Sequence, residues 1–486
     1  MVKRTIGATL FTLGLFGLLL WAASCAVNPV SGQRELMLMS EDKEIQLGGQ
    51  TDADVVRQFG IYEDQKLNAY VNGLGQRIAK VSHRPHLAYQ FKVLDVAVVN
   101  AFAVPGGYVY FTRGILATLN SEAELAGVLG HEIGHITARH SAQQISRAQL
   151  AQMGIAMGSI FSETFSALSG LTGMGMQMLF LKFSRDNERQ ADDLGVEYAS
   201  KVGYDASQMA NFFETLDRMQ PHSDKSGLPS WFSTHPNPED RERVVRERSR
   251  EWQQKLGQKS PNIGRDTYLT HIDGLVFGED PRQGYMDAGV FYHPQLRFRF
   301  PVPGNWNVNN TPSQVQMVRK QRDAAILLSI TSGTSPRQAA INFAETSRAS
   351  VIKYDGRKVN GLSAYRLISD IRAQGGLVRV MSYFIAKDNY IYVFHGLSSP
   401  QSFEAYASLF DRTMGQFSHL TDPKRINVQP DRIRIRATKN AGTMGSVLRS
   451  LGVPEKEHEN MALLNGKSLK DPLPANTMIK VVQKGR

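Results

Sequence analysis

The chain has 486 residues, which is too long for a single hydrophobic core, so we expect two or three domains. Its hydrophobic content of 42% and charged content of 21% are those of an ordinary globular protein and exclude an intrinsically disordered chain. The formal net charge is +11 and is unevenly spread: residues 420–486 hold 13 Lys and Arg against 6 Asp and Glu, a balance of +7. Such an excess suits an anionic cell-envelope surface.

The amino end is predicted to be a targeting segment. Residues 1–24 are typical of a signal peptide, with a basic start, an apolar run over 6–21 and small residues before the only cysteine, Cys25. A lone cysteine cannot form a disulfide within its chain. Ala-Ala-Ser-Cys resembles a bacterial lipobox, with alanine where leucine is more usual, which implies cleavage before Cys25 and its lipidation. Ala26 is not the aspartate of an inner-membrane retention signal, which favours the outer membrane. An uncleaved anchor with a spare cysteine is the alternative, and both place the protein in the periplasm.

The first folded segment is predicted to be helical and then β-stranded. Apolar residues recur at helical spacing over residues 40–81. Alternating, β-branched residues predict a strand over 91–99, and residues 107–111 predict another after a Pro-Gly-Gly turn. We expect these helices to pack behind a site that lies further along the chain.

One helix over residues 121–150 is predicted to carry the chemistry, with a capping box at its start and an apolar stripe at helical spacing. His131 and His135 are four residues apart, so they lie on the same face and can hold one metal ion. Glu132 lies beside them, where it can take a proton from water but is not placed as a ligand. The alternative is a helix with two surface histidines, and a third ligand decides between the two.

The charged run at residues 185–193 is predicted to supply that ligand from a second helix. Glu188 and Asp192 are four residues apart and share a face. Zinc sites for hydrolysis use three protein ligands and leave one position open, and two histidines with a glutamate are one standard set. Glu188 would complete this set, and Asp192 would accept a hydrogen bond from a ligand imidazole and fix its tautomer. The alternative is a solvated helix face.

Residues 148–181, between these two helices, contain one charge, Glu163, among methionines, glycines and small polar residues. The stretch is long enough to span a bilayer, but its glycines and hydroxyl groups make a poor membrane helix. We expect a flexible amphipathic hairpin that covers the active site and offers methionines to varied apolar partners. A buried core segment and a membrane contact are the alternatives.

Three motifs in order point to a known family. Residues 131–140, 187–192 and 100–116 resemble segments of the M48 family of zinc metallopeptidases, and the resemblance extends over residues 35–255. It is greatest to the periplasmic, lipoprotein-type members. The resemblance implies a mainly helical, gluzincin-like domain, one Zn²⁺ ion and endopeptidase action on proteins.

The resemblance also implies roles for residues outside the ligand set. In zincins a strand edge beside the metal binds the substrate backbone, so Tyr108, Val109 and Tyr110 are predicted to bind substrate, with a core strand as the alternative. His140 matches the family motif but lies five residues past His135, off the ligand face. We interpret it as a structural histidine or as one that supports a ligand.

A further histidine lies in the loop at residues 229–238. Thr-His235-Pro followed by Arg241 looks like the family, which places His235 near the zinc. His235 could be catalytic and stabilise the oxyanion that forms as water adds to the peptide carbonyl. It could instead occupy the open zinc position and hold the enzyme latent. A loop histidine with a satisfied backbone hydrogen bond is the third alternative.

The remaining chain is predicted to form two binding domains after a polar linker at residues 256–285. Residues 286–422 are β-rich and resemble PsbP/Mog1-like α/β sandwich domains, and they carry no catalytic cluster, which favours a binding or adaptor role. Residues 428–486 are basic and resemble a LysM-like cell-wall-binding module, although residues 474–476 depart from its usual glycine turn. A small solvated domain is the alternative for this last segment.

Together these features predict an α+β protein that is a zinc endopeptidase of the periplasm, anchored by lipid at the outer membrane. Zinc would lower the pKa of its water towards 7, and Glu132 would take that proton and pass it to the leaving amine. The family implies quality control of misfolded or unassembled envelope proteins. A chaperone or assembly factor for outer-membrane proteins with a latent metal site is the alternative, and a wall-binding scaffold is a third. Expected partners are protein substrates, the outer membrane, and peptidoglycan or outer-membrane assembly machinery, but not nucleic acid.

Overall fold

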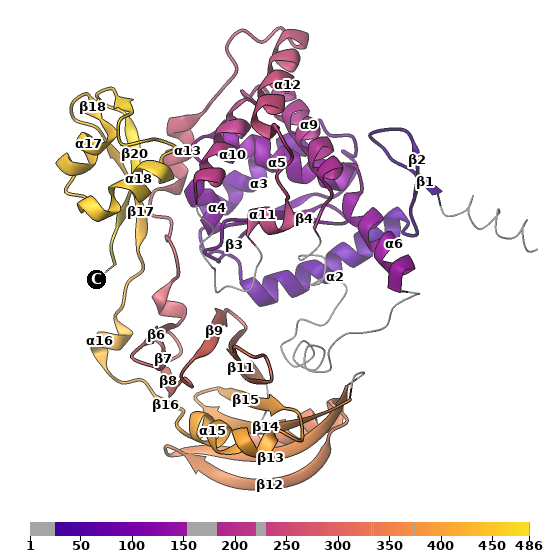
Figure 1. The fold of residues 1–486 in the computed structure, drawn as a ribbon, viewed down its shortest axis with the longest axis vertical. Helices are drawn as coiled ribbons and strands as arrows, with labels where there is room; N and C mark the ends of the chain where they lie inside the picture. Colours follow the sequence, from indigo (N-terminus) through magenta and orange to yellow (C-terminus); the bar gives the residue numbers. More distant parts are fainter. Residues whose placement is uncertain are drawn as a thin grey trace, which may run out of the picture.

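The computed structural model describes residues 25–152, 182–219, 230–331, 333, 335–373 and 376–485. The predicted signal peptide at 1–24 and most of the predicted hairpin, residues 153–181, lie outside the described residues. Figure 1 shows a helical body, a sheet domain below it and a small C-terminal module at one side. Among the described residues, no helix combines the length and the apolar character needed to cross a membrane.

The helical body is built from ten helices of the described chain and a small sheet. The helices are α2 (Glu41–Phe59), α3 (Gln65–Ala79), α4 (Arg113–Thr118), α5 (Glu122–Thr137), α6 (His140–Gln152), α9 (Arg185–Lys201), α10 (Gln208–Arg218), α11 (Trp231–Thr234), α12 (Arg241–Lys255) and α13 (Arg265–Ile272). A ribbon of β1 (Cys25–Val27) and β2 (Arg34–Leu36) precedes them. Every residue of α5 is buried, so α5 is the central helix of this body.

The predicted helix over 121–150 is two helices, and the reason is local. Ser121 caps α5 as predicted by accepting from the Glu124 N–H, while the Glu124 carboxylate accepts from the N–H of Asn120 at 2.7 Å. At the other end, Arg139 has a φ of 58°, which interrupts the helix before α6. The turned Arg139 side chain donates to the buried Glu44 carboxylate. A positive φ at arginine has no helical-spacing signature, so the apolar stripe does not reveal the bend.

The small sheet corrects the prediction for the substrate-binding strand. Its order is β3 (Gln90–Leu94), β5 (Tyr108–Thr112), β4 (Ala101–Val104), so β5 lies in the middle and pairs on both sides. The prediction that Tyr108, Val109 and Tyr110 form a free edge is therefore wrong, because a central strand has no unpaired backbone to offer. The alternative of a core strand agrees with the structure: Val109 and Tyr110 are fully buried, and the Tyr110 hydroxyl donates to Asp52.

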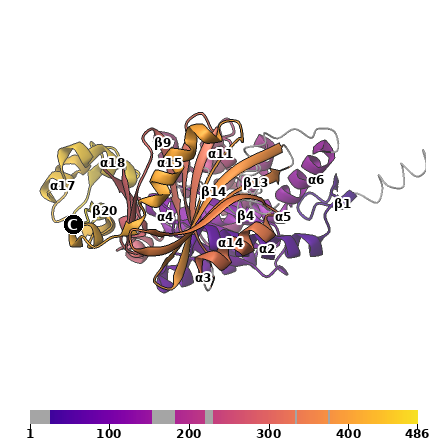
Figure 2. The ribbon, with the colours of Figure 1, turned by 90° about the horizontal axis from the view of Figure 1, so that it is seen from below.

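The sheet domain is a seven-stranded antiparallel sheet with a helix on each face. Its order is β12 (Ser350–Val359), β13 (Leu362–Ala373), β14 (Gly376–Lys387), β15 (Tyr390–Ser398), β11 (Ala324–Thr331), β10 (Gln314–Arg319), β9 (Trp306–Thr311). α15 (Phe403–Gly415) packs on the face that includes Tyr383, and α14 (Pro336–Thr346) packs on the opposite face with Phe384. Figure 2 shows both helices against the sheet. A second sheet has the order β16 (Ser418–His419), β8 (Phe298–Pro301), β7 (Val290–His293), β6 (Tyr285–Asp287).

Residues 256–285, predicted as a polar linker, contain α13, whose apolar side chains correct that prediction. Tyr268, Leu269 and Ile272 are fully buried and belong to the same core as α5. The Tyr268 hydroxyl donates to the carbonyl of Leu116 in α4 at 2.5 Å. Because α13 is short, its apolar positions were too few to give a helical pattern against the polar residues that flank them.

The C-terminal module shares a core with the helical body. It consists of β17 (Arg432–Ala437), β18 (Gly442–Thr443), α17 (Met444–Ser450), α18 (His458–Leu464), β19 (Pro472–Leu473) and β20 (Met478–Gln483), connected to the sheet domain through α16 (Pro423–Ile426). Ile433, Leu448 and Ile479 belong to the same apolar cluster as the side chains of α5. β20 packs against α13, as Figure 1 shows.

Lys480 fastens this module to the body by a buried polar contact. Its Nζ donates to the carbonyls of Ala117, Thr118 and Leu119, at 2.8, 3.2 and 2.9 Å, at the end of α4. Those carbonyls lack partners within their own helix, so a buried donor there satisfies groups that would otherwise be costly to bury. The module is therefore docked on the helical body.

Replacing Lys480 by methionine is expected to lower the free energy of unfolding by about 2–3 kcal/mol, because the carbonyls of Ala117 and Leu119 stay buried without a donor, while that of Thr118 keeps the Asn120 side chain as its donor. The measurement is chemical denaturation of the full chain. Lys484→Met is the matched control, since Lys484 forms an exposed ion pair with Asp431 and should change stability by about 0.5 kcal/mol or less. Equal effects of the two substitutions would contradict the docking role of Lys480.

Candidate metal centre

Three glycines bring α5 and α9 unusually close together. A Cβ on Gly130 would lie 2.9 Å from the backbone oxygen of Gly195, and one on Gly195 would lie 3.0 Å from the backbone nitrogen of His131. A Cβ on Gly134 would likewise press on the backbone of Ala191 at 3.2 Å. Only residues without a side chain allow this approach. It sets the carboxylates of α9 directly against the histidines of α5.

Four buried side chains converge at this crossing. His131, His135, Glu188 and His235 each offer one ligand atom, and these atoms all lie within 4.8 Å of one another. His131 Nε2 lies 3.0 Å from His135 Nε2 and 3.6 Å from Glu188 Oε2, and His135 Nε2 lies 3.4 Å from Glu188 Oε1. Two imidazoles and a carboxylate are the donor set of hydrolytic zinc sites. The alternatives of surface histidines and a solvated Glu188 do not fit, because these side chains are buried.

The protonation states of the proposed ligands suit a divalent cation. Burial lowers the pKa of His131 well below its usual value and that of His135 to about 3, so both rings are neutral donors. Burial alone would raise the pKa of Glu188, but the charge of His235 and hydrogen bonds with His135 and His235 hold it well below its usual value. Neutral imidazoles and an ionised carboxylate are the forms that bind zinc.

A second ring of contacts orients these donors. His131 Nδ1 lies 2.8 Å from Asp192 Oδ1, as predicted for a carboxylate that fixes the tautomer of a ligand imidazole. Arg241 at the start of α12 donates to both Asp192 oxygens, each at 2.8 Å, and its Nη2 lies 3.4 Å from Glu188 Oε2. Burial raises the pKa of Asp192 to about 6, and Arg241 opposes that rise. The guanidinium therefore compensates the charges of two buried carboxylates.

His140 contacts the other histidine of α5. Its Nδ1 lies 2.9 Å from His135 Nδ1, and its Nε2 lies 2.9 Å from the Gln190 Oε1 of α9. His140 is buried and contacts Nδ1 of His135, the ring nitrogen that does not face the cluster. A residue that contacts this second nitrogen can orient a ligand imidazole. The bend at Arg139 brings it there.

Glu132 is buried beside the cluster with an open carboxylate. Neither of its oxygens has a hydrogen-bond partner among the described residues. Burial raises its pKa to about 7, against the opposing effect of His235, whose Nε2 lies 3.7 Å from Glu132 Oε1. A buried polar group without a partner is uncommon and calls for a functional explanation. A proton acceptor with a pKa near 7 is suited to general base catalysis at neutral pH.

His235 lies inside the cluster, where the resemblance placed it, and the sequence left only its role open. Its Nδ1 is 3.1 Å from Glu188 Oε1 and 3.3 Å from His131 Nε2, and its ring stacks on Trp231 with a centroid separation of 4.2 Å. Burial would lower the pKa of His235, but Glu188 and Glu132 raise it above the usual value. The contacts with Glu188 and His131 exclude a loop histidine held only by backbone.

Sequence reasoning did not assign roles to Arg241, Gln190 or Trp231, which the structure brings to the site. Arg241 stood at the start of a strongly charged helix, and its charge did not distinguish it from the exposed arginines nearby. Phe183 was also missed; its ring stacks on His135 with a centroid separation of 4.0 Å. Because these contacts join distant parts of the chain, no local spacing signals them.

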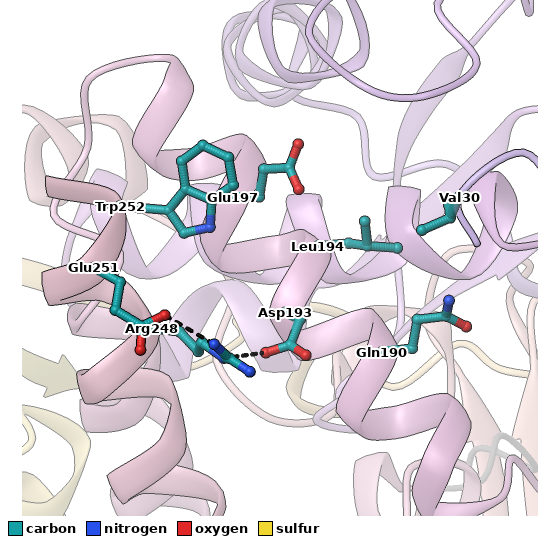
Figure 3. Close-up of a pocket in the computed structure, with 8 residues that line it drawn as sticks. All are labelled: Val30, Gln190, Asp193, Leu194, Glu197, Arg248, Glu251 and Trp252. Atoms are coloured by element: carbon teal, nitrogen blue, oxygen red, sulfur yellow. Dashed lines mark hydrogen bonds and ion pairs between the residues drawn. The ribbon is translucent and has the colours of Figure 1, made fainter. Parts of the chain in front are cut away.

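The outer side of α9 bears a separate hollow of about 300 Å³ (Figure 3). Asp193 lines it and lies 3.3 Å from Arg248, which also contacts Glu251 at 2.8 Å. Asp192, one residue earlier, instead contacts His131 in the buried cluster. Successive helical residues point about 100° apart, so these two neighbouring aspartates lie on different faces of α9.

Asp192→Asn is expected to weaken zinc binding by about 10–100-fold, because it removes the charge that orients His131 and pairs with Arg241. Asp193→Asn serves as the matched control and should leave the affinity unchanged. Competition with a zinc chelator measures both dissociation constants. A similar loss in both variants would show that helix α9, rather than the Asp192–His131 contact, is responsible.

Comparison with known proteins identifies the helical body. Residues 61–249 match peptidase family M48. These residues form a peptidase family M48 domain. The match includes the two histidines and the glutamate of the cluster and confirms the resemblance inferred from the motifs.

Curated proteins align with about half of this chain. The chain is 32% identical over 200 residues to the "Putative beta-barrel assembly-enhancing protease" of Vibrio cholerae, covering 40% of this chain and 41% of that protein. It is 28% identical over 273 residues to the "Beta-barrel assembly-enhancing protease" of Escherichia coli K12, covering 54% and 55%. The chain thus spans about half the length of these relatives. The solved structures that match include PsbP from Synechocystis sp. PCC 6803, at 15% identity and a TM-score of 0.23, covering 28% of this chain and 91% of that one.

Proposed function

We propose that the protein is a zinc-dependent endopeptidase of the cell envelope that hydrolyses peptide bonds in misfolded or unassembled envelope proteins. The observation that carries the proposal is the buried cluster of two histidines and a glutamate with the unpartnered Glu132 beside it. The M48 match and the protease names of the relatives favour a peptidase over the chaperone alternative. A gluzincin-like arrangement of the domain is part of this proposal.

The donor set fits one zinc ion. His131, His135 and Glu188 would hold it, with Asp192 and His140 orienting the two imidazoles. Zinc in such a site supplies Lewis acidity, which makes water a stronger acid and nucleophile at neutral pH. The chain itself supplies a water-excluding environment, because these ligand side chains are buried.

Glu132 is assigned the role of general base and then general acid. Its free carboxylate oxygens can accept a proton from the attacking water and return it to the nitrogen of the leaving amine. The backbone N–H of Ala103 lies close enough to oppose the rise in the Glu132 pKa. That N–H belongs to β4, so the strand beside the base is β4.

We assign substrate binding to β4 (Ala101–Val104) in place of β5. In the sheet order β3-β5-β4, β4 pairs with β5 on one side, and among the described strands its other edge is free. An extended peptide could add to that edge through main-chain hydrogen bonds. This placement would bring a scissile bond towards Glu132, which β4 neighbours through Ala103.

Of the two roles predicted for His235, the contacts favour occupation of the fourth metal position. Its ring nitrogens lie among the ligand atoms of His131 and Glu188, and its stacking on Trp231 holds the ring there. A water must reach that position for hydrolysis. We propose that His235 holds the enzyme latent until α11 and its loop move.

Incubation with an unfolded protein tests this function. The full chain purified in detergent should cut the substrate when zinc is present, lose activity with a chelator and regain it with added zinc. His235→Ala should raise the cleavage rate at least several-fold, because it frees the fourth position. Zinc binding with no cleavage by either protein would overturn the proposed activity. A slower His235→Ala variant would support the oxyanion role instead of latency.

The envelope location rests on Cys25, the two C-terminal domains and the relatives. We propose lipid attachment at Cys25 at the outer membrane, a binding or adaptor role for residues 286–422, and envelope-surface binding by the basic, LysM-like residues 428–486. The names of the relatives refer to β-barrel assembly. Outer-membrane assembly machinery and peptidoglycan are therefore the partners to examine first.

A further inference from the structure

The outer edge strand of the sheet domain exposes both its backbone and its apolar side chains. β12 is the last strand of the seven-stranded sheet and, among the described strands, pairs with β13 alone. In Figure 1 it lies at the margin of the sheet farthest from the helical body. Val351, Ile352 and Tyr354 are 47%, 52% and 64% exposed. Apolar side chains on an open edge are a typical site for an added strand.

The backbone of β12 is regular enough to accept a strand. A bulge lies at Ile352, and from Lys353 to Val359 the register with β13 is unbroken. On such an edge, every second residue directs its N–H and C=O away from the partner strand. The seven-residue stretch is about as long as an ordinary strand, so it can bind an extended segment of similar length.

Aromatic side chains provide a surface for that segment. Tyr354 stacks on Tyr365 of β13, with a centroid separation of 6.1 Å and an interplanar angle of 16°. The buried Leu367 lies directly across from Tyr354 in the sheet. An added strand would place alternate apolar or aromatic side chains beside this pair, which favours apolar residues at every second position.

The charges of the strand select its partner. Asp355 is paired with Arg357 and Arg366. Lys353 and Lys358 are exposed and have no carboxylate partner in the described part of the chain. Because side chains alternate along a strand, Lys353 lies on the face opposite Tyr354, where it would meet acidic side chains of an added strand, and Lys358 lies on the Tyr354 face. Both lysines repel a second copy of the same edge. The bulge at Ile352 also disfavours edge-to-edge pairing of identical strands.

We propose that β12 binds an extended, unfolded segment of a protein substrate in which apolar or aromatic residues alternate with acidic ones. The proposal rests on the proposed peptidase function, for which β12 is a substrate-recruiting site remote from the metal cluster. Main-chain hydrogen bonds would supply most of the affinity, and the tyrosine pair on one face and Lys353 on the other would supply the selectivity.

Fluorescence anisotropy with a defined peptide tests the binding. The probe is a fluorescein-labelled ten-residue peptide in which valine and tyrosine alternate with glutamate, and the protein is the full chain with Glu132→Gln, so that the peptide is not cut. We expect the double substitution Ile352→Glu and Tyr354→Glu to weaken binding at least tenfold. Tyr390→Glu is the matched control: Tyr390 is 48% exposed but begins a central strand, and its substitution should change nothing.

A second probe tests the backbone contacts without altering the protein. The same peptide with N-methyl groups on alternate residues cannot donate along one edge and should bind at least tenfold more weakly. The proposal would be overturned if the methylated and unmethylated peptides bound equally. It would also be overturned if the double-substituted protein bound the peptide as tightly as the Tyr390→Glu control. A dimer in sedimentation velocity that the double substitution abolishes while the peptide fails to bind would overturn it as well, because β12 would then join two copies.

Cleavage assays separate this proposal from the proposed function. With Glu132 intact, the double substitution should raise the KM for an unfolded protein at least fivefold and leave the hydrolysis of a short peptide unchanged. If the unsubstituted chain cuts neither substrate, the peptidase function fails, while the anisotropy results still decide whether β12 binds extended segments. If KM for the unfolded protein is unchanged, β12 is not a recruiting site.

Discussion

Glu132→Gln is expected to lower kcat for peptide-bond hydrolysis by about 10²–10⁴-fold, the range that general acid–base catalysis contributes. The physical reason is that glutamine keeps the shape of the side chain but cannot accept the proton of the attacking water. The measurement is cleavage of an unfolded protein at saturating zinc. Because Glu132 is not among the ligand atoms of the cluster, the zinc content of the variant should match that of the unsubstituted chain.

Stability separates this catalytic role from a structural one. Glu132 is buried and both its oxygens lack partners, so its ionised form costs folding free energy. Glutamine carries no charge, and we expect its thermal unfolding temperature to equal or exceed that of the unsubstituted chain. Activity should therefore fall while stability does not. Loss of both together, or full activity in the variant, would show that Glu132 is not the base.

The residues of the metal cluster could be predicted because their spacing is local. Residues four apart in a helix share a face, which was enough to group His131 with His135 and Glu188 with Asp192. The two pairs are brought together by the close approach of α5 and α9 at Gly130 and Gly195. The glycines permit this approach, but their presence in the sequence does not predict it. The family motifs supplied that link in advance of the structure.

Strand order could not be predicted in the same way. The alternation of residues 107–111 predicted a strand correctly, yet it could not show that β5 lies between β3 and β4. At β12 the strand itself was missed in the sequence analysis. Its exposed, partly charged residues resemble a loop, because an outer edge needs no buried face over much of its length.

Contacts between distant parts of the chain could not be predicted from the sequence either. Lys480 was counted with the basic residues of the C-terminus, which suggested a solvated surface, but it is buried against the end of α4. Similarly, α13 lay in a stretch read as a linker. In both cases a polar local composition concealed a residue whose partner lies more than a hundred positions away.

Arg241→Gln is expected to have the largest effect on stability, a loss of about 3–5 kcal/mol, because it removes one partner of a buried ion-pair network. Its side chain is fully buried, with bonds of 2.8 Å to both Asp192 oxygens, and its guanidinium carbon lies 3.7 Å from the centre of the Phe213 ring. Glutamine would leave the carboxylates of Asp192 and Glu188 buried without that cation. Urea denaturation of the metal-free chain measures the loss.

The same substitution should weaken zinc binding by about 10–100-fold, since Asp192 would no longer be held against His131. Arg243→Gln, two residues further along α12, is the control: Arg243 forms exposed pairs with Asp240 and Glu247, so its loss should leave the stability nearly unchanged. Zinc binds only the folded site, so saturating zinc should stabilise both variants against unfolding. Because Arg241→Gln binds zinc more weakly, it should need a higher zinc concentration to reach the same stabilisation. If Arg241→Gln unfolds more easily yet binds zinc as tightly as the control, Arg241 supports the fold alone. If its affinity falls as predicted, one arginine couples the packing of α12 to the geometry of the metal ligands.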